Sequence, residues 1–341
     1  MKKKISIFIV SIMLIVSCLV GLTACGNTNT KTTIKIAVPD GAPAIAITNI
    51  VKDGLTLSSN QKLSLDITEP SNVKNSVQAK NIDMAILPTN IATALYSASL
   101  AKKDNNPYVM VATATYGNLY IISKNSTATY EQMKGNVLYA IGKNAIPGKV
   151  LEKVLSFNNI KYKEITKIEE KEDNKINIMY VKDGPAVIQA INSSTSEVFG
   201  MLADPAVTLQ KIQGKKVCYD LQKEYQLSTN SDVLGYPQAV LIAKKSFIES
   251  NKDIVIKFID KMEENINFIN NDENQSAGLE NILKNNKFGT PSAIKKIPAP
   301  SIKGCNIVVK SSIDAKKDVV NLLNNLSLNA VSDDFFYDLN K

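Results

Sequence analysis

The stretch Ile82–Asn90 (IDMAILPTN) contains the pattern that decides the fold of this 341-residue chain. An apolar run of strand length stops at Pro88, which lacks the N–H that a continuing strand would donate. Thr89 and Asn90 follow, and Thr and Asn commonly cap the N-terminus of a helix. Residues 91–98 have apolar side chains at helical spacing. The stretch therefore predicts a strand that leads directly into a helix, the repeating unit of α/β folds.

The same unit recurs on both sides of this stretch. Besides 82–87, strands are predicted at 33–38, 62–68, 108–114, 119–123, 137–141, 175–180, 198–202, 216–220, 238–243 and 305–309. Besides 91–98, helices are predicted at 42–51, 72–79, 149–157, 185–191, 206–212, 250–269, 275–283 and 315–326. This alternation of strands and helices predicts an α/β fold with parallel sheet.

The order of the elements divides the chain into two α/β lobes. The first alternating series covers residues 33–122, and the second covers residues 123–233. The remainder has few strands and several helices, so we expect residues 234–341 to complete the first lobe. The chain then crosses between the lobes twice, near Leu119–Lys124 and near Leu234–Ala239, with a ligand cleft between the lobes.

The N-terminus has the pattern of a secretion signal. Lys2, Lys3 and Lys4 precede an apolar run, Ile5–Leu22, which leads into the sequence LTACGN of Leu22–Asn27. A membrane-spanning helix needs about 20 mostly apolar residues, and serines interrupt this run, so an uncleaved anchor is the weaker alternative. The LTAC sequence resembles a bacterial lipobox, in which a peptidase cuts before an acylated cysteine.

The lipobox resemblance implies a particular location for the protein. We expect residues 1–24 to be a lipoprotein signal peptide, Cys25 to carry acyl chains such as palmitate, and residues 25–32 to be a flexible tether. The acyl chains would hold the protein on the extracytoplasmic face of the cell membrane.

Composition excludes several classes of function. The chain has no histidine and no tryptophan, so the commonest metal ligand and general base is missing, and we predict no metal, cofactor or catalytic residue. Without residues 1–24 the net charge falls from +8 to +5, and the remaining charge is spread along the chain without a basic block, which argues against nucleic acid binding. Cys218 and Cys305 could form a disulfide or remain two separate buried thiols.

Several motifs resemble the substrate-binding lipoproteins of nitrate/sulfonate/taurine-type ABC importers. The resemblance runs from about residue 33 to the C-terminus, and it rests on residues 40–44 (DGAPA), 83–90 (DMAILPTN), 116–120 (YGNLY), 142–147 (GKNAIP), 202–208 (LADPAVT), 235–237 (GYP), 304–308 (GCNIV) and 333–337 (DDFFY). It implies a two-lobed type II periplasmic-binding-protein fold. It also implies a monomer that closes on one small molecule and delivers it to ABC permease and ATPase subunits.

The ligand is expected beyond the carboxyl ends of the strands, where helix N-termini present free N–H groups. Strand-to-helix loops and turns at these ends supply the candidate ligand-binding residues Asp40, Gly41, Ala42, Thr89, Asn90, Tyr116, Gly117, Asn118, Lys143, Asn144, Ala145 and Asp204, and Tyr236 lies near the second crossing. Each also has a structural alternative, as a turn, a helix cap or a packing residue.

The candidate loops also bear on the kind of ligand. They contain no arginine, and Lys143 is their one cation. A strongly anionic ligand usually attracts an arginine fork, so the loops favour a neutral, aromatic or zwitterionic ligand such as a vitamin precursor, with sulfonates still open. Asp40 could pair with a cationic group of the ligand.

Two other functions remain as alternatives. A sensory lipoprotein would bind a ligand but pass the signal to a receptor instead of a permease. An enzyme of the thiamine-pyrimidine-synthase type would have the same fold. Those enzymes use an active-site histidine, which this chain lacks, so we do not expect an enzyme.

Overall fold

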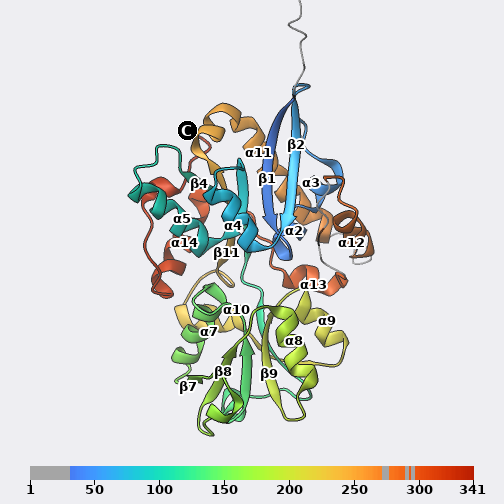
Figure 1. Ribbon diagram of the computed structural model, residues 1–341, viewed down its shortest axis with the longest axis vertical. Coiled ribbons are helices and arrows are strands. Elements are labelled where there is room, and N and C mark those ends of the chain that lie inside the picture. The colour runs from blue at the N-terminus through green and yellow to red at the C-terminus, as the bar shows by residue number, and fades with distance from the viewer. Residues whose placement is uncertain (1–30, 271–275, 289–291, 293–295) are drawn as a thin grey trace, which may run out of the picture. The chain divides into compact units, whose positions relative to one another are not determined.

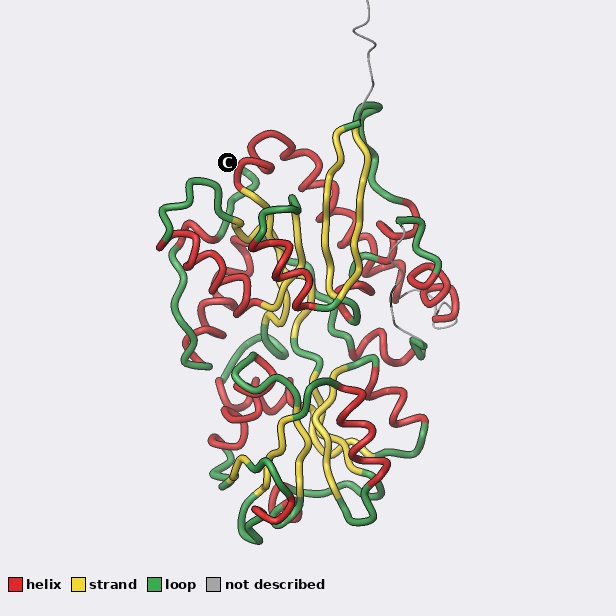
Figure 2. The backbone as a smooth tube through the Cα atoms, in the orientation of Figure 1, coloured by secondary structure: helices red, strands yellow, loops and turns green. Residues whose placement is uncertain are grey.

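The computed structural model describes residues 31–270, 276–288, 292 and 296–341 (Figure 1). Of the described residues, 31–33 and 57–62 belong to a small unit, and the others belong to a large unit. In the described part of the small unit, the N–H of Thr32 donates to the carbonyl of Asn60 at 2.8 Å. The large unit contains most of two β-sheets and the helices that flank them (Figure 2).

The first sheet has the strand order β2-β1-β3-β11-β4. Its strands are β1 (Thr32–Pro39), β2 (Gln61–Thr68), β3 (Met84–Pro88), β4 (Tyr108–Tyr116) and β11 (Pro237–Lys244). β1 and β3 are parallel, as predicted, but β11 runs antiparallel to both β3 and β4. The sheet is mixed because β11 enters from the second crossing instead of following a crossover helix.

The second sheet has the strand order β10-β5-β9-β6-β8-β7. Its strands are β5 (Leu119–Ser123), β6 (Val137–Ala140), β7 (Tyr162–Glu164), β8 (Ile176–Tyr180), β9 (Val198–Ala203) and β10 (Lys216–Asp220). β6, β7, β8 and β9 form parallel pairs, whereas β5 is antiparallel to β9 and β10. Because β5 belongs to this sheet, the chain changes sheets between Tyr116 and Leu119, before the predicted boundary at residue 122.

Helices flank both sheets. The α-helices are α2 (Ala42–Ile45), α3 (Thr48–Asp53), α4 (Pro70–Gln78), α5 (Thr89–Ala101), α6 (Tyr130–Met133), α7 (Ile146–Phe157), α8 (Gly184–Ser193), α9 (Ala206–Ile212), α10 (Leu221–Thr229), α11 (Lys245–Asn270), α12 (Ser276–Lys284), α13 (Ala299–Gly304) and α14 (Ser312–Asn325). Short 3₁₀ turns, η1 and η3, cover Ile168–Glu170 and Asp333–Phe335. Within the described ranges, none of the helices has the length and apolarity required to cross a membrane.

The predicted helix 42–51 is interrupted, and a buried asparagine of α11 explains the break. The side chain of Asn265 accepts the N–H of Asn49 at 2.9 Å and donates to the carbonyl of Ile45 at 2.8 Å. The hydroxyl of Thr48 donates to the same carbonyl at 2.9 Å. These side chains satisfy backbone groups that a continuous helix would pair internally, so the chain forms α2 and α3 instead.

Several other elements differ from the sequence prediction, and the short helices α6 and α13 are among those that the sequence pattern did not predict. The sequence pattern did not predict β7 or α10, although Asp220 caps α10 by accepting the N–H groups of Gln222 and Lys223, a pattern visible in the sequence. The predicted strand 305–309 is not a strand; among the described residues its one strand-type pairing is an isolated bridge between Ile307 and Thr115.

Helices cover both faces of the second sheet. On one face, α7 and α10 pack on a cluster that contains Leu138, Ile178 and Phe199. On the other face, α8 and α9 pack on Val137 and other residues. The first of these clusters also contains Leu322 and Leu326, so the C-terminal helix α14, which contacts β4 and β11 of the first sheet, is also tied to the core of the second.

Candidate functional site

The candidate loops of the first sheet leave the ends of two neighbouring parallel strands. Ile36 of β1 is in register with Met84 of β3, so the loops that follow Pro39 and Pro88 begin at the same edge of the sheet. The loops after β6 and β9 have the same relation in the second sheet, because Val137 is in register with Val198. Each sheet therefore presents a pair of candidate loops at the carboxyl ends of parallel strands.

The loop after β1 is ordered by its own aspartate. The side chain of Asp40 accepts the N–H of Gly41 at 2.9 Å and a hydrogen bond from the hydroxyl of Ser292. Gly41 has φ 101°, a conformation that favours glycine, and a Cβ built there would meet no atom within 4 Å. Ala42 is buried at the start of the short helix α2. The loop thus leaves open space over the backbone of Gly41.

The loop after β3 has one satisfied and one unsatisfied side chain. Neither Thr89 nor Asn90 caps α5, because both lie inside the helix and Pro88 occupies the cap position. The hydroxyl of Thr89 is buried and donates to the carbonyl of Pro237 at 2.7 Å, so it joins α5 to β11. The Oδ1 of Asn90 is buried and has no hydrogen-bond partner among the described residues.

A second unsatisfied amide lies at the same end of the sheet, and the sequence analysis missed it. Gln238 precedes Ala239, which is paired with Pro88 across β11 and β3. The buried Oε1 of Gln238, like Oδ1 of Asn90, has no partner in the described part of the chain. Since buried polar atoms are normally hydrogen-bonded, these two amide oxygens are unused acceptors at this sheet edge that a ligand could satisfy.

The loop after β6 carries a charged pair and an aromatic ring. Lys143 forms a half-exposed ion pair with Glu164, and its Nζ lies 5.8 Å from the ring centroid of Tyr180. Asn144 is exposed and has φ 62°, and Ala145 precedes α7 without a side-chain cap. The buried hydroxyl of Tyr180 has no partner among the described residues, which makes it a further candidate that the sequence did not suggest.

The remaining candidates lie where the two crossings meet and are connected by several hydrogen bonds. We call this region the joint; its candidates are Tyr116, Gly117, Asn118, Asp204 and Tyr236. The N–H of Gly117 donates to the carbonyl of Tyr236 at 2.8 Å, and the carbonyl of Gly117 accepts from the side chain of Asn306 at 3.0 Å. A Cβ on Gly117 would lie 2.6 Å from the ring of Tyr236. Only glycine therefore allows the first crossing to approach the second this closely.

Asn118 and Asp204 fasten the first crossing to the end of β9. The side chain of Asn118 donates to the carbonyl of Asp204 at 3.0 Å, and the N–H of Asp204 donates back to the carbonyl of Asn118 at 3.0 Å. The carboxylate of Asp204 accepts the N–H and the hydroxyl of Thr208 at 2.9 and 2.8 Å. The side chain of Asn118 and Oδ1 of Asp204 are thus already bonded within the protein.

Gln222 of α10 makes a further contact in the joint that the sequence did not suggest. Its buried amide donates to the carbonyl of Leu119 at 2.9 Å and accepts the N–H of the same residue at 2.6 Å. This two-bond contact satisfies the first residue of β5, just after the chain changes sheets. No motif marks such a glutamine, because its role depends on the tertiary approach of α10.

The two tyrosines of the joint differ in how their hydroxyls are satisfied. The hydroxyl of Tyr116 donates to the carboxylate of Asp318 at 2.6 Å, and burial together with this bond raises the pKa of Tyr116. Tyr236 is 1% exposed and packs edge-on against Tyr225 at 4.9 Å between ring centroids. Its hydroxyl has no partner among the described residues. Burial raises the pKa of Tyr236 as well.

The structure therefore sorts the predicted residues into two groups. It brings Tyr116, Gly117, Asn118, Asp204 and Tyr236 together in the joint, where contacts within the protein occupy most of their polar groups. It places the other candidates on strand-end loops, and ligand binding by all of them remains a prediction. In the described ranges, no group of three or more acidic or cysteine residues could hold a metal ion, and Cys218 and Cys305 are separate thiols.

Comparison with known proteins identifies the fold. No protein-family model and no curated protein matches the chain. Among solved structures, an ABC transporter protein from Parabacteroides distasonis is similar at a TM-score of 0.69 and 18% identity, over 90% of this chain and 99% of that chain. The periplasmic aliphatic sulphonate binding protein SsuA from Escherichia coli has a TM-score of 0.59 and 13% identity, over 89% and 91%.

A third similar structure is described by its fold. A conserved Candida albicans gene product, described as having the generic periplasmic binding protein fold, has a TM-score of 0.52 and 13% identity, over 89% of this chain and 93% of that chain. At these identities the similarity concerns the fold. The prediction of a two-lobed, type II periplasmic-binding-protein fold of the α/β class is confirmed.

The two joint tyrosines provide a matched test of the hydrogen bonding described above. Tyr116→Phe removes a bond to a carboxylate and should lower the free energy of unfolding by about 1.5–3 kcal/mol. Tyr236→Phe removes a buried hydroxyl without a partner and should leave stability unchanged or raise it by up to about 1 kcal/mol. Urea unfolding of both variants measures the difference. Equal losses in the two variants would contradict the hydrogen-bond assignment.

Asp204 should make the stability depend on pH. Burial raises its pKa above the ordinary value of 3.8, and the bonds from Thr208 only partly oppose this effect. A raised pKa of an acid in the folded state gives stability that is present below the ordinary pKa and is lost as pH rises through the folded-state pKa.

We therefore expect Asp204→Asn to gain stability relative to the wild type as pH rises from about 4 to about 8, since the variant buries no charge. Urea unfolding across this range measures the difference, with the exposed Asp253→Asn as control. A difference between Asp204→Asn and wild type that stays constant or shrinks with rising pH would show that burial does not govern this carboxyl group.

Proposed function

We propose that this chain is an extracytoplasmic, lipid-anchored solute-binding protein. It captures a small molecule between its two lobes and delivers the molecule to the permease and ATPase subunits of an ABC importer. The observation that carries this proposal is that each of the two sheets presents strand-to-helix loops at the ends of parallel strands. Both sheets also have unsatisfied polar side chains there: Asn90 and Gln238 on the first sheet and Tyr180 on the second.

The solved structures support the same function through their descriptions. The Parabacteroides distasonis protein is described as an ABC transporter, and SsuA as a periplasmic sulphonate binding protein. A Staphylococcus aureus protein with a TM-score of 0.59 and 14% identity, over 90% of this chain and 97% of that chain, is described as a ligand-binding component of an ABC-type import system.

The joint between the crossings would act as the hinge. Gly117 lies in the first crossing, and Gly235, with φ 81°, lies in the second. Backbone at such positions absorbs changes in φ and ψ, while the bond from Gly117 to Tyr236 keeps the two crossings together. A ligand that contacts both sheets would shift the population toward the closed form, and the permease would recognise that form.

The unsatisfied groups favour a neutral or zwitterionic ligand. Two amides and a phenol form hydrogen bonds without requiring a charged partner. Lys143, the one cation of the candidate loops, is already paired with Glu164. A vitamin precursor of this chemistry fits such a surface better than a strong anion does, while a sulfonate would have to rely on Lys143 and on the N–H groups that begin α5 and α7.

A ligand screen tests the proposed function. Thermal shift of residues 26–341 should show a hit among thiamine precursors, riboflavin, sulfonates, taurine, nitrate and polyamines, because a ligand of the native state raises the melting temperature. Asn90→Ala and Gln238→Ala should each weaken binding of that hit by roughly tenfold, since each removes a hydrogen bond to the ligand.

The exposed Asn75→Ala on α4 is the matched control and should bind as the wild type does. Small-angle scattering with the hit should show a smaller radius of gyration. A hit whose affinity is the same in Asn90→Ala, Gln238→Ala and Asn75→Ala, or that gives no compaction, would place the ligand elsewhere or remove closure from the mechanism.

The lipid anchor has a separate test, because Cys25 lies outside the described residues. Cells that express the full chain and are fed an alkyne fatty acid should give a labelled, membrane-associated protein. Cys25→Ala should abolish the label and release the chain from the membrane fraction, because the acylated thiol is missing. Cys18→Ala, within the predicted signal, is the control and should still be labelled. Labelled Cys25→Ala protein would mean that the LTAC sequence is not a lipobox.

A further inference from the structure

A cavity of about 270 Å³ lies beside the joint, and it is separate from the strand-end loops. One wall is the end of α10 with the second crossing, residues 229–233 and 235–237, and another is α14. Tyr116 and Tyr225 also line it. None of the strand-end residues Asp40–Ala42, Thr89, Asn90 or Lys143–Ala145 belongs to its lining. Its size suits a ligand of a few heavy atoms.

One residue of the cavity lining has a buried polar group that lacks a partner. Tyr236 lines the cavity and is 1% exposed, and its hydroxyl makes no hydrogen bond to any residue that the structure describes. Leaving such a group unsatisfied is unfavourable, and a polar molecule that bonded to this hydroxyl would remove that cost. The neighbouring hydroxyl of Tyr116 differs, because Asp318 already accepts its hydrogen bond.

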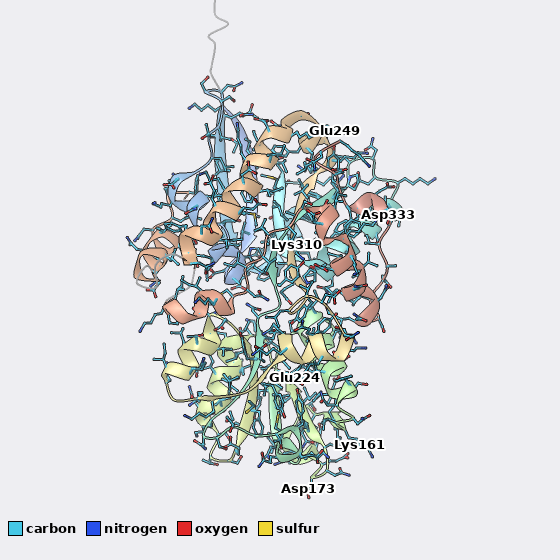
Figure 3. All side chains as sticks on the ribbon, turned by 180° about the vertical axis from the view of Figure 1, so that it is seen from behind. Lys161, Asp173, Glu224, Glu249, Lys310 and Asp333 are labelled. Carbon is cyan, nitrogen blue, oxygen red and sulfur yellow. The ribbon has the colours of Figure 1, made fainter. Side chains whose placement is uncertain are left out.

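The charges of the lining are of both signs. Asp318 is neutralised by Lys310, whose Nζ lies 2.8 Å from its carboxylate; Figure 3 labels Lys310 on the segment that precedes α14. Asp232 on the second crossing and Lys317 on α14 are exposed, and neither forms an ion pair with a residue of the described ranges. The second crossing therefore supplies the carboxylate of Asp232, and α14 supplies the ammonium group of Lys317.

These charges select one class of ligand. A simple anion would meet the carboxylates of Asp232 and Asp318 in the lining, and a simple cation would meet the ammonium group of Lys317. A small zwitterion can place its ammonium group near Asp232 and its carboxylate near Lys317, with polar atoms left for Tyr236 and for Asn321 and Asn325 on α14. We propose that this cavity binds a free amino acid or a zwitterion of similar size.

Binding there would act on the hinge of the proposed function. The second crossing forms one wall, and α14 is anchored on β4 and β11 of the first sheet and, through Leu322 and Leu326, in the core of the second. A molecule that binds to both walls stabilises the conformation of the second crossing in which both walls can contact it. The amino acid would thereby change the affinity of the strand-end loops for their own ligand.

Calorimetry with the amino acids tests the proposal. The probes are the standard amino acids, each compared with the amine and the carboxylic acid that lack one of its charges. We expect at least one amino acid to bind residues 26–341 and its single-charge analogues to bind more weakly. Asp232→Asn and Lys317→Gln should each weaken binding roughly two- to fivefold, as expected for exposed charges, and Tyr236→Phe should weaken it without a loss of stability.

Matched controls separate this site from the strand-end loops. Asp253→Asn and Lys257→Gln on α11 remove an exposed acid and an exposed base outside the cavity and should bind the amino acid normally. Asn90→Ala and Gln238→Ala should also leave amino acid binding unchanged, whatever they do to the solute. Absence of binding by every amino acid would overturn the proposal. So would binding that Asn90→Ala weakens and Asp232→Asn does not, since the amino acid would then be the solute of the strand-end loops.

Discussion

The structure depends on the close approach of its two crossings at Gly117. The N–H of Gly117 bonds to the carbonyl of Tyr236, and the ring of Tyr236 occupies the space that a side chain at position 117 would need. A bulkier residue would push the second crossing away and expose a fully buried aromatic ring. The amide of Gln222 then fixes the start of β5 from the other side. The path between the sheets is thus set by backbone hydrogen bonds and by one missing Cβ.

This joint explains why the sheets differ from simple α/β alternation. A chain that returns through the second crossing meets the first sheet from the opposite direction, so β11 lies antiparallel between β3 and β4. The return also brings Pro237 next to Thr89. The hydroxyl of Thr89 donates its hydrogen bond to the carbonyl of Pro237. The strand-end loop after β3 is therefore positioned by the crossing itself. Movement at the crossing would reach this loop directly, without a long chain of intermediate contacts.

Most strands and helices could be predicted from the sequence, because apolar periodicity and punctuation by Pro88 or Asp204-Pro205 are local signals. What the sequence could not show depends on contacts between distant segments. Asn265 breaks a helix more than two hundred residues away, and Gln222 recognises the backbone of Leu119. The sequence also identified the residues of the crossings without distinguishing their roles. Tyr116 and Asn118 have residue types suited to ligands, but their polar groups are bonded within the protein.

The division between satisfied and unsatisfied groups limits where a ligand can gain affinity. A hydrogen bond to Asn118 or Thr89 would have to replace a bond within the protein, so the net gain would be small. A bond to the buried oxygens of Asn90 or Gln238 replaces nothing and removes a desolvation cost of about 1–3 kcal/mol for each group. For a ligand at the strand ends, as proposed, the gain in affinity would therefore come from a few neutral groups. A ligand matched to amide and phenol groups would gain from this arrangement, whereas a strong anion would lose its hydration while Lys143, the one cation of the candidate loops, is already paired with Glu164.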